Sequence, residues 1–313
     1  MMRIRLFAAT ALTLLLQQCF SQDTGTFAFL RNDVSARAAA LNGSFVSMTS
    51  DPNVLFYNPA SLVTISSPKV SLGYLKNLLD VNSGSLVFAQ DVQGVGNIGV
   101  GVDFVDYGTF TRTDQSQNDL GSFSASELAL VAGYAMMLDE QSSVGGNIKY
   151  IHSSIAEYSS TALAVDLGFL YQVPSQNITI GGSILNLGRQ LSEYGSTREL
   201  LPLDIVIGIT KRPEHLPVML NLNFHKLNEQ RVKAFDRLTS FTFGAEFLMS
   251  ESVRLRFGYN NEQHRDLKLG TTAGLAGFSL GAGFILNEYL IDYAFNSYGK
   301  IGGLHRISLG MNF

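Results

Sequence analysis

The last ten residues of the chain contain the feature that most constrains its fold. Apolar and polar side chains alternate there, and the apolar positions are Ile307, Leu309, Met311 and Phe313. The residues between them are polar or small. A period of two residues is typical of a β-strand whose two faces meet different surroundings. The sequence therefore predicts a strand over residues 304–313.

The same alternation continues from residue 68 to the end of the chain. Stretches around Val100, Leu167, Phe243, Leu255 and Tyr293 each carry large apolar residues on one parity and charged residues or glycine on the other. The charges on the polar parity are Asp103, Glu127, Lys149, Asp166, Asp204, Glu246, Arg254, Arg256, Asp292 and Arg306. A soluble sandwich exposes such a charged face to water, whereas a membrane barrel turns the apolar face to lipid. Alternation alone does not separate the two.

The gaps between the strands favour the barrel. The pattern predicts about fourteen strands, at 68–76, 83–91, 96–107, 124–137, 141–153, 160–173, 176–187, 202–212, 216–225, 238–250, 252–261, 277–286, 289–297 and 304–313. Short turns alternate with longer connections, which include 108–123, 188–201, 226–237 and 262–276. This arrangement and an even strand number are typical of outer-membrane barrels. We expect an all-β fold, a transmembrane antiparallel β-barrel at residues 67–313, with the charges of the polar parity in its lumen.

The composition agrees with a membrane barrel. Of the 313 residues, 46% are hydrophobic and only 15% are charged. Beyond the N-terminal region, no apolar run reaches the ~20 residues that a transmembrane helix needs. Hydrocarbon offers no hydrogen-bond partners, so a chain without such helices can span it only as a closed barrel. The net charge of −4 and the lack of a basic patch with interleaved aromatics give no case for nucleic acid as a partner.

Residues 1–21 have the composition of a secretory signal peptide. An apolar stretch follows Arg3 and Arg5, and Cys19 and Ser21 occupy the −3 and −1 positions of a small-residue cleavage site. The alternative is a lipoprotein acylated at Cys19, but the two glutamines before this residue fit a lipobox poorly.

Residues 22–66 lack the alternation and predict a compact segment ahead of the barrel. Ser35 suits the N-cap of a short helix in the alanine run that follows, and the Asn-Gly pair at 42–43 suits its end. Pro52 and Pro59 suit turns or first helical positions and argue against ladder strands. Two interpretations stay open: a compact, mostly non-strand segment ahead of the sheet of a barrel, and a plain lead-in packed on one face of a sandwich.

No motif for catalysis, cofactor binding or metal binding appears. The five histidines have no paired-ligand spacing, and the stretch that begins at Asp80 and Asn82 lacks the closing Glu of a calcium loop. The sequence also lacks a nucleophile elbow, a P-loop and a dinucleotide fingerprint. We therefore expect a protein that is not an enzyme and has no catalytic residue, cofactor or metal site.

Both ends of the chain resemble the PorV/PorQ family, outer-membrane barrels related to the long-chain fatty-acid transporter FadL. The residues that carry the resemblance are 29–30, 35–43, 50–52 and 57–62 in the opening segment and 291–295 and 302–309 at the end. The resemblance implies a fourteen-stranded FadL-like barrel with a hatch folded into its lumen. The hatch residues are then Ser35, Arg37, Asp51, Asn58, Pro59 and Ala60, and Arg37 or Asp51 would pair with lumen charges.

The same resemblance implies a role in the type IX secretion pathway. A protein of this kind would bind or pass on secreted cargo at the surface of a Gram-negative cell, through the loops at 108–123, 188–201 and 226–237. Its partners would be outer-membrane lipid, other secretion-system proteins and the cargo. The closing strand also resembles the signal that the barrel-assembly machinery recognises. The alternative function is a FadL-like outer-membrane transporter of small hydrophobic compounds, and the sequence separates the two poorly because both need a barrel and a hatch.

Overall fold

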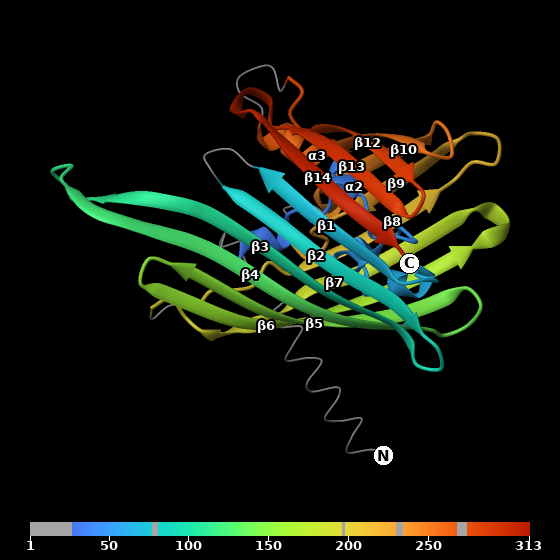
Figure 1. Ribbon diagram of the computed structural model, residues 1–313, viewed down its shortest axis with the longest axis horizontal. Helices are drawn as coiled ribbons and strands as arrows, with labels where there is room; N and C mark the ends of the chain where they lie inside the picture. The colour runs from blue at the N-terminus through green and yellow to red at the C-terminus, as the bar shows by residue number, and fades with distance from the viewer. Residues whose placement is uncertain (1–26, 77–80, 196–197, 230–233, 268–273) are drawn as a thin grey trace, which may run out of the picture.

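The strands form one closed barrel. The computed structural model describes residues 27–76, 81–195, 198–229, 234–267 and 274–313. In these ranges fourteen strands follow one another around the barrel, each antiparallel to its neighbours (Figure 1). The barrel closes where β1 pairs with β14, with Lys69 opposite Asn312. The predicted antiparallel barrel of about fourteen strands is confirmed, whereas the predicted signal peptide lies outside the described residues.

Most strand ends lie close to their predicted positions. The strands are β1 (Lys69–Lys76), β2 (Asn82–Val92), β3 (Gly96–Thr113), β4 (Asp119–Met137), β5 (Ser142–Ile155), β6 (Tyr158–Val173), β7 (Ile178–Ser192), β8 (Asp204–Lys211), β9 (Val218–Phe224), β10 (Phe241–Leu248), β11 (Val253–Asn260), β12 (Phe278–Leu286), β13 (Tyr289–Ser297) and β14 (Gly303–Asn312).

The predicted loop at 108–123 is wrong over most of its length. β3 and β4 continue through it as a long arm that projects beyond the rest of the barrel, and only 114–118 connects them (Figure 1). Residues 109–113 and 119–122 of the arm are exposed. Because both faces of the arm are exposed, its sequence lacks the alternation that marks the other strands.

The connections define two rims. The short-turn rim carries 93–95, 138–141, 174–177, 212–217, 249–252 and 287–288. The described residues of the long-loop rim are 81, 114–118, 156–157, 193–195, 198–203, 225–229, 234–240, 261–267, 274–277 and 298–302. The tight turn at 156–157 is the exception on the long-loop rim. The helix α3 (Asn261–Asp266) and the 3-10 helices η5 (Ala234–Thr239) and η6 (Gly299–Ile301) lie in long loops, and η4 (Pro174–Gln176) lies in a short turn.

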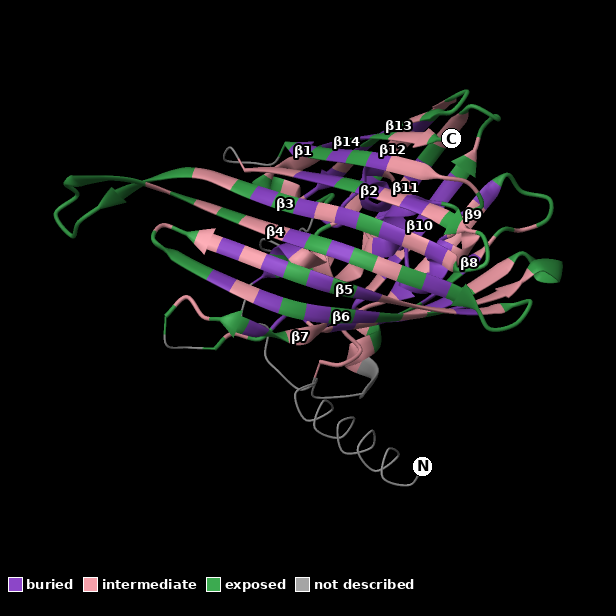
Figure 2. Cartoon of the chain, turned by 60° about the horizontal axis from the view of Figure 1, so that its bottom comes forward, coloured by how far each residue is buried: buried purple, intermediate pink, exposed green. Residues whose placement is uncertain are grey.

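Burial across the barrel wall is the reverse of that in a soluble protein. Figure 2 shows buried and exposed residues alternating along the strands. The exposed positions carry large apolar side chains, among them Leu72, Val100, Ile148, Leu167, Leu280, Ile307 and Leu309. The buried positions carry polar ones, among them Ser71, Asn147, Asp166, Glu246 and Arg256. Such a wall suits lipid outside and a polar interior.

Residues 27–66, which we call the plug, lie inside the barrel. They form η1 (Ala28–Arg31), α2 (Ala36–Ala40), η2 (Pro52–Phe56) and η3 (Pro59–Thr64). The helix α2 contacts β11 to β14, whereas η3 contacts β2 to β6, so the plug reaches from one side of the wall to the other. None of the described helices is both long and apolar enough to cross a membrane. The role of the plug as a hatch stays a prediction.

The short helices of the plug begin and end at the predicted residues. The hydroxyl of Ser35 accepts the backbone N–H of Ala38 and caps α2. Asn42 and the following glycine adopt left-handed conformations just after the helix, with φ of 51° and 70°. Pro52 and Pro59 occupy the first positions of η2 and η3. The predicted cap, stop and proline positions are confirmed.

Glycines in the wall make room for the plug. A Cβ atom added at Gly145 would lie 2.5 Å from the carbonyl carbon of Pro59 and 2.6 Å from the backbone nitrogen of Ala60. Real Cβ atoms do not approach backbone this closely, so a side chain at Gly145 would push the plug away. At the next residue, Gly146, an added Cβ would meet the carbonyl oxygen of Asp166 at 3.5 Å, which is ordinary contact.

We therefore expect Gly145→Ala to destabilise the protein by about 1–3 kcal/mol, as overpacking does in well-packed interiors. Gly146→Ala is the matched control and is expected to change the stability much less. Thermal unfolding in detergent and limited proteolysis of the plug measure the difference. Equal behaviour of the two variants would contradict the close packing of the plug against β5.

Candidate functional site

A cluster of buried charges ties the plug to one side of the wall. Arg37 on α2 donates to both carboxylate oxygens of Glu246 on β10, each at 2.9 Å. Arg256 on β11 donates to the same carboxylate at 2.6 Å and to Asp292 on β13 at 2.5 Å. The guanidinium of Arg37 also lies 3.1 Å from Asp51 of the plug. We call these five residues the latch.

The latch connects one plug helix to three strands. Glu246 and Arg256 are each only 3% exposed, so neither charge has bulk water to replace its partner. Arg37 thus lies against lumen charges, in the kind of pairing that the family resemblance implies, while Asp51 pairs with Arg37 itself. Asp51 has a second task, because its carboxylate accepts the N–H of Asn53 and caps η2.

The corner at residues 58–60 fastens the plug to the other side of the wall. The side-chain amide of Asn58 donates to the carbonyl oxygen of Phe169 on β6, at 3.0 Å. Ser143 on β5 donates to the carbonyl oxygen of Ala60, at 3.2 Å. Between these contacts, the ring of Pro59 lies against Gly168 on β6 and its backbone carbonyl against Gly145 on β5. The corner therefore lies near the short-turn ends of both strands.

A second buried ion pair stabilises an irregularity in the wall. Lys149 on β5 lies 2.9 Å from Asp166 on β6, and its amine also donates to Asn186 on β7, at 2.8 Å. Asp166 in turn accepts the backbone N–H of Asn186, whose φ of 61° marks a shift of register between β6 and β7. The alternation in the sequence predicted that both charges face the lumen, but it did not predict the register shift between β6 and β7.

The other predicted lumen charges lie in three different surroundings. Glu127 is partly buried and accepts hydrogen bonds from Tyr107, at 2.5 Å, and Ser153, at 3.1 Å. Arg254 lies near the short-turn rim, where it donates to backbone carbonyl oxygens of residues 250 and 253. Asp103 and Arg306 are buried and line a cavity.

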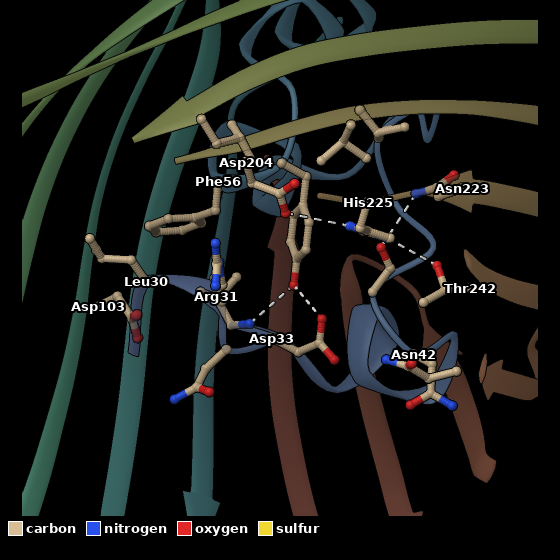
Figure 3. Close-up of a pocket in the computed structure, with 18 of the residues that line it drawn as sticks. Leu30, Arg31, Asp33, Asn42, Phe56, Asp103, Asp204, Asn223, His225 and Thr242 are labelled. Carbon is tan, nitrogen blue, oxygen red and sulfur yellow. Dashed lines mark hydrogen bonds and ion pairs between the residues drawn. The ribbon is translucent and has the colours of Figure 1, made fainter. Parts of the chain in front are cut away.

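This cavity lies between the plug and the long-loop rim (Figure 3). Its volume is about 520 Å³, which is within the usual range for small-molecule sites. The plug contributes Asp33, Phe56 and Tyr57 to its lining. The wall contributes the strand ends that lead into long loops, including Asp204 and Tyr298 near them. The cavity therefore lies toward the long-loop ends of the strands, with plug residues forming part of its lining.

The lining combines apolar and polar groups. Its apolar members include Leu30, Phe56, Leu75, Val131, Leu185 and Val206. The hydroxyl of Tyr57 donates to the carboxylate of Asp33 and accepts the backbone N–H of Val34, both at 3.1 Å. Burial raises the pKa of the Asp33 carboxyl, and the positive charge of Arg306 opposes that rise. A cavity of this composition can hold a small amphipathic molecule.

His225 is a cavity residue that the sequence analysis set aside. Its Nδ1 lies 3.7 Å from the Asp204 carboxylate, and its Nε2 lies 3.1 Å from the hydroxyl of Thr242 (Figure 3). Single scattered histidines give no sequence signal, and this one is brought to Asp204 only by the pairing of neighbouring strands. Among the described residues, no group of three or more His, Cys, Asp and Glu side chains is arranged to hold a metal ion.

The closing strand lies as a lipid-facing strand would. Ile307 and Leu309 are exposed on the outer face of β14, and Met311 is partly exposed. Phe313 follows the strand and is exposed. The last backbone N–H, that of Phe313, donates to the carbonyl oxygen of Pro68, next to the start of β1. Recognition of this strand by the assembly machinery stays a prediction.

Solved structures resemble this barrel although their sequences do not. The toluene transporter TbuX of Ralstonia pickettii matches with a TM-score of 0.61 at 12% identity, covering 89% of this chain and 98% of that one. The toluene transporter TodX of Pseudomonas putida gives 0.59 at 12% identity, with the same coverage. A FadL homologue of Pseudomonas aeruginosa gives 0.56 at 10%, covering 90% and 98%.

Comparisons of the sequence itself give no such match. No known family model matches the chain, and no curated protein matches it in sequence. The resemblance to the PorV/PorQ family thus has no support beyond its own motifs. At identities of 10–12%, the structural likeness establishes that this chain has the fold of FadL-type outer-membrane barrels.

Proposed function

We propose that this protein is a FadL-like channel of the bacterial outer membrane that admits small hydrophobic compounds. The observation that carries the proposal is the partly apolar cavity between the plug and the strand ends that lead into the long loops. Long loops face the outside in outer-membrane barrels, so the cavity would open toward the medium. The apolar outer face supports a position in the membrane, and the likeness to two toluene transporters supports this class of compound.

Uptake of labelled toluene tests the proposal. The protein is produced in a Gram-negative host that lacks its own FadL-type barrel, and its presence in the outer-membrane fraction is checked. We expect the initial rate of toluene uptake to rise severalfold over cells with the empty vector. A barrel that is present in the outer membrane but leaves the rate unchanged would overturn the proposal.

Secretion through the type IX pathway is the second candidate, and the β3–β4 arm favours it. The arm projects beyond the barrel (Figure 1). It carries a stacked pair, Phe110 and Phe123, with ring centroids 5.3 Å apart, and Phe110 is exposed. Such a surface suits contact with another protein. Deletion of the gene in its own host separates the candidates. We expect uptake to fall while the profile of secreted proteins stays the same, and loss of secreted cargo with normal uptake would favour secretion instead.

A further inference from the structure

Among the charged side chains that line the cavity, Arg306 and Asp103 differ from the others because they have no direct partner in the described part of the chain. Most charges in the lining have direct partners: Lys149 has Asp166, Lys226 has Glu262 at 3.2 Å, and the carboxylate of Asp204 accepts the backbone N–H of residue 226. Asp33 accepts the Tyr57 hydroxyl, and Arg31 donates to a backbone carbonyl oxygen. These groups already have partners in the protein, so a ligand would have to compete with those partners for them.

Arg306 and Asp103 have no such partner. Arg306 is 6% exposed and Asp103 is 8% exposed, and both line the cavity. Within the described part of the chain, neither side chain makes a direct hydrogen bond or ion pair, and in Figure 3 no dashed line reaches Asp103. Arg306 and Asp103 act on each other through the space of the cavity, and Arg306 acts in the same way on Asp33, which already accepts the Tyr57 hydroxyl. Buried charges are normally paired. Each of these two side chains, however, lacks a directly contacting group of opposite charge among the described residues.

The barrel register places these two groups apart. Asp103 on β3 lies opposite Ser85, which lies opposite Gly73 on β1, which lies opposite Ser308 on β14. Arg306 is two residues from Ser308 along the same strand. Three steps between neighbouring strands amount to roughly 14 Å of wall. Both side chains line the cavity from these positions and interact without direct contact, so a ligand between them can reach both charges.

We infer that the cavity binds a small amphipathic zwitterion, with its carboxylate on Arg306, its ammonium group on Asp103 and carbon atoms between them. A guanidinium binds a carboxylate through two parallel hydrogen bonds, and a carboxylate binds an ammonium group as a compact charge. A ligand with only one charge would leave the other buried group unsatisfied. Leu30 and Phe56, which also line the cavity, would contact the carbon chain. The inference goes beyond the proposed channel, because it assigns the cavity a ligand that is charged at both ends.

Binding of 8-aminooctanoate tests the inference. The purified full-length protein is titrated calorimetrically in a non-ionic detergent at pH 7 with this zwitterion, and in parallel with octanoate and octylamine. These two probes have the same number of carbon atoms and one charge each. We expect 8-aminooctanoate to bind at least tenfold more tightly than either. If octanoate or octylamine binds as tightly as the zwitterion, the inference is wrong.

Variants assign the two ends of the ligand. Asp103→Asn is expected to reduce the affinity for 8-aminooctanoate to that for octanoate, and Arg306→Gln is expected to reduce it to that for octylamine. Arg306→Lys keeps the positive charge but cannot form the two parallel hydrogen bonds of a guanidinium, so it should give an intermediate affinity. Arg254→Gln removes a charge from outside the cavity and should keep the preference, and a heat-modifiability assay shows whether each variant is folded. A preference that survives both Asp103→Asn and Arg306→Gln would overturn the assignment.

Together with the toluene assay, the binding experiment tests the inference and the proposed function independently. Toluene uptake without any preference for the zwitterion would remove the inference and leave the channel. Tight binding of 8-aminooctanoate without toluene uptake would keep the binding site and remove the proposed channel for hydrophobic compounds.

Discussion

Replacement of Glu246 by glutamine is expected to destabilise the barrel by about 3–5 kcal/mol, the usual loss when one member of a buried ion pair is removed. The carboxylate of Glu246 accepts hydrogen bonds from Arg37 on the plug and from Arg256 on the wall. Glutamine has no negative charge and only one acceptor oxygen, so two buried guanidinium groups would lose their common partner. Asp51 and Asp292 would remain as their only latch carboxylates.

The same change should loosen the plug. Arg37 is the latch residue of α2, and its bonds to Glu246 join the plug to β10. Without them, we expect a larger ionic conductance in planar bilayers and faster cleavage of the plug by proteases, together with a lower unfolding temperature in detergent. Normal conductance in a destabilised barrel would mean that the latch stabilises the wall but does not keep the lumen closed.

Glu157→Gln is the matched control for this prediction. Glu157 makes the same kind of bond, with Arg112 at 2.8 Å, but the two side chains are 58% and 45% exposed on the long-loop side of the barrel. Exposed ion pairs contribute little to stability because water replaces either partner. We expect no measurable change in unfolding temperature or conductance. A large effect of Glu157→Gln would show that burial is not what gives the latch its strength.

Replacement of Ile148 by arginine is the second change with a large expected effect. Ile148 lies near the middle of β5, and its side chain is 66% exposed on the apolar outer face. An arginine at the bilayer midplane of such a barrel costs about 2–4 kcal/mol. We expect a lower folded fraction of Ile148→Arg when the unfolded chain is refolded into lipid vesicles, measured by heat modifiability on gels.

Leu286→Arg provides the control at the edge of the same face. Leu286 is exposed at the end of β12, next to the short turn at 287–288. The cost of an arginine falls to about 0–1 kcal/mol near the membrane interface. The two variants add the same charge, so a difference between them measures depth in the membrane. If both fold into vesicles equally well, the outer face does not meet hydrocarbon, and the membrane assignment fails.

The sequence predicted the wall of the barrel well because each strand carries its own signal. The parity of residues such as Ile148 and Lys149 depends only on their position along one strand, and lipid and lumen impose opposite requirements on the two parities. The arm of β3 and β4 was not predicted, because residues 109–113 are exposed on both faces and neither face requires apolar side chains. The register shift at Asn186 escaped it as well, since it depends on contacts with Asp166 on another strand.

The contacts of the plug show a similar division. Ser35, Pro52 and Pro59 could be placed in advance, because caps and first helical turns depend on neighbouring residues in the chain. The pairing of Arg37 with Glu246 spans 209 positions of sequence, and no local pattern selects that one carboxylate from the other lumen charges. The cavity depends on the plug and many strands at once, so its two unpaired charges become visible only in the folded chain.

The sequence alone thus determined that the chain is a fourteen-stranded barrel with an apolar outside, a polar inside and a compact, helical N-terminal segment. The tertiary structure decided where that segment contacts the wall, which charges hold it, and which two buried charges line the remaining cavity without a direct partner. The physical reason is the distance along the chain over which each kind of interaction acts. Alternation and capping act over a few residues of chain, whereas ion pairing and cavity shape act over ångströms between residues that the closure of the barrel brings together.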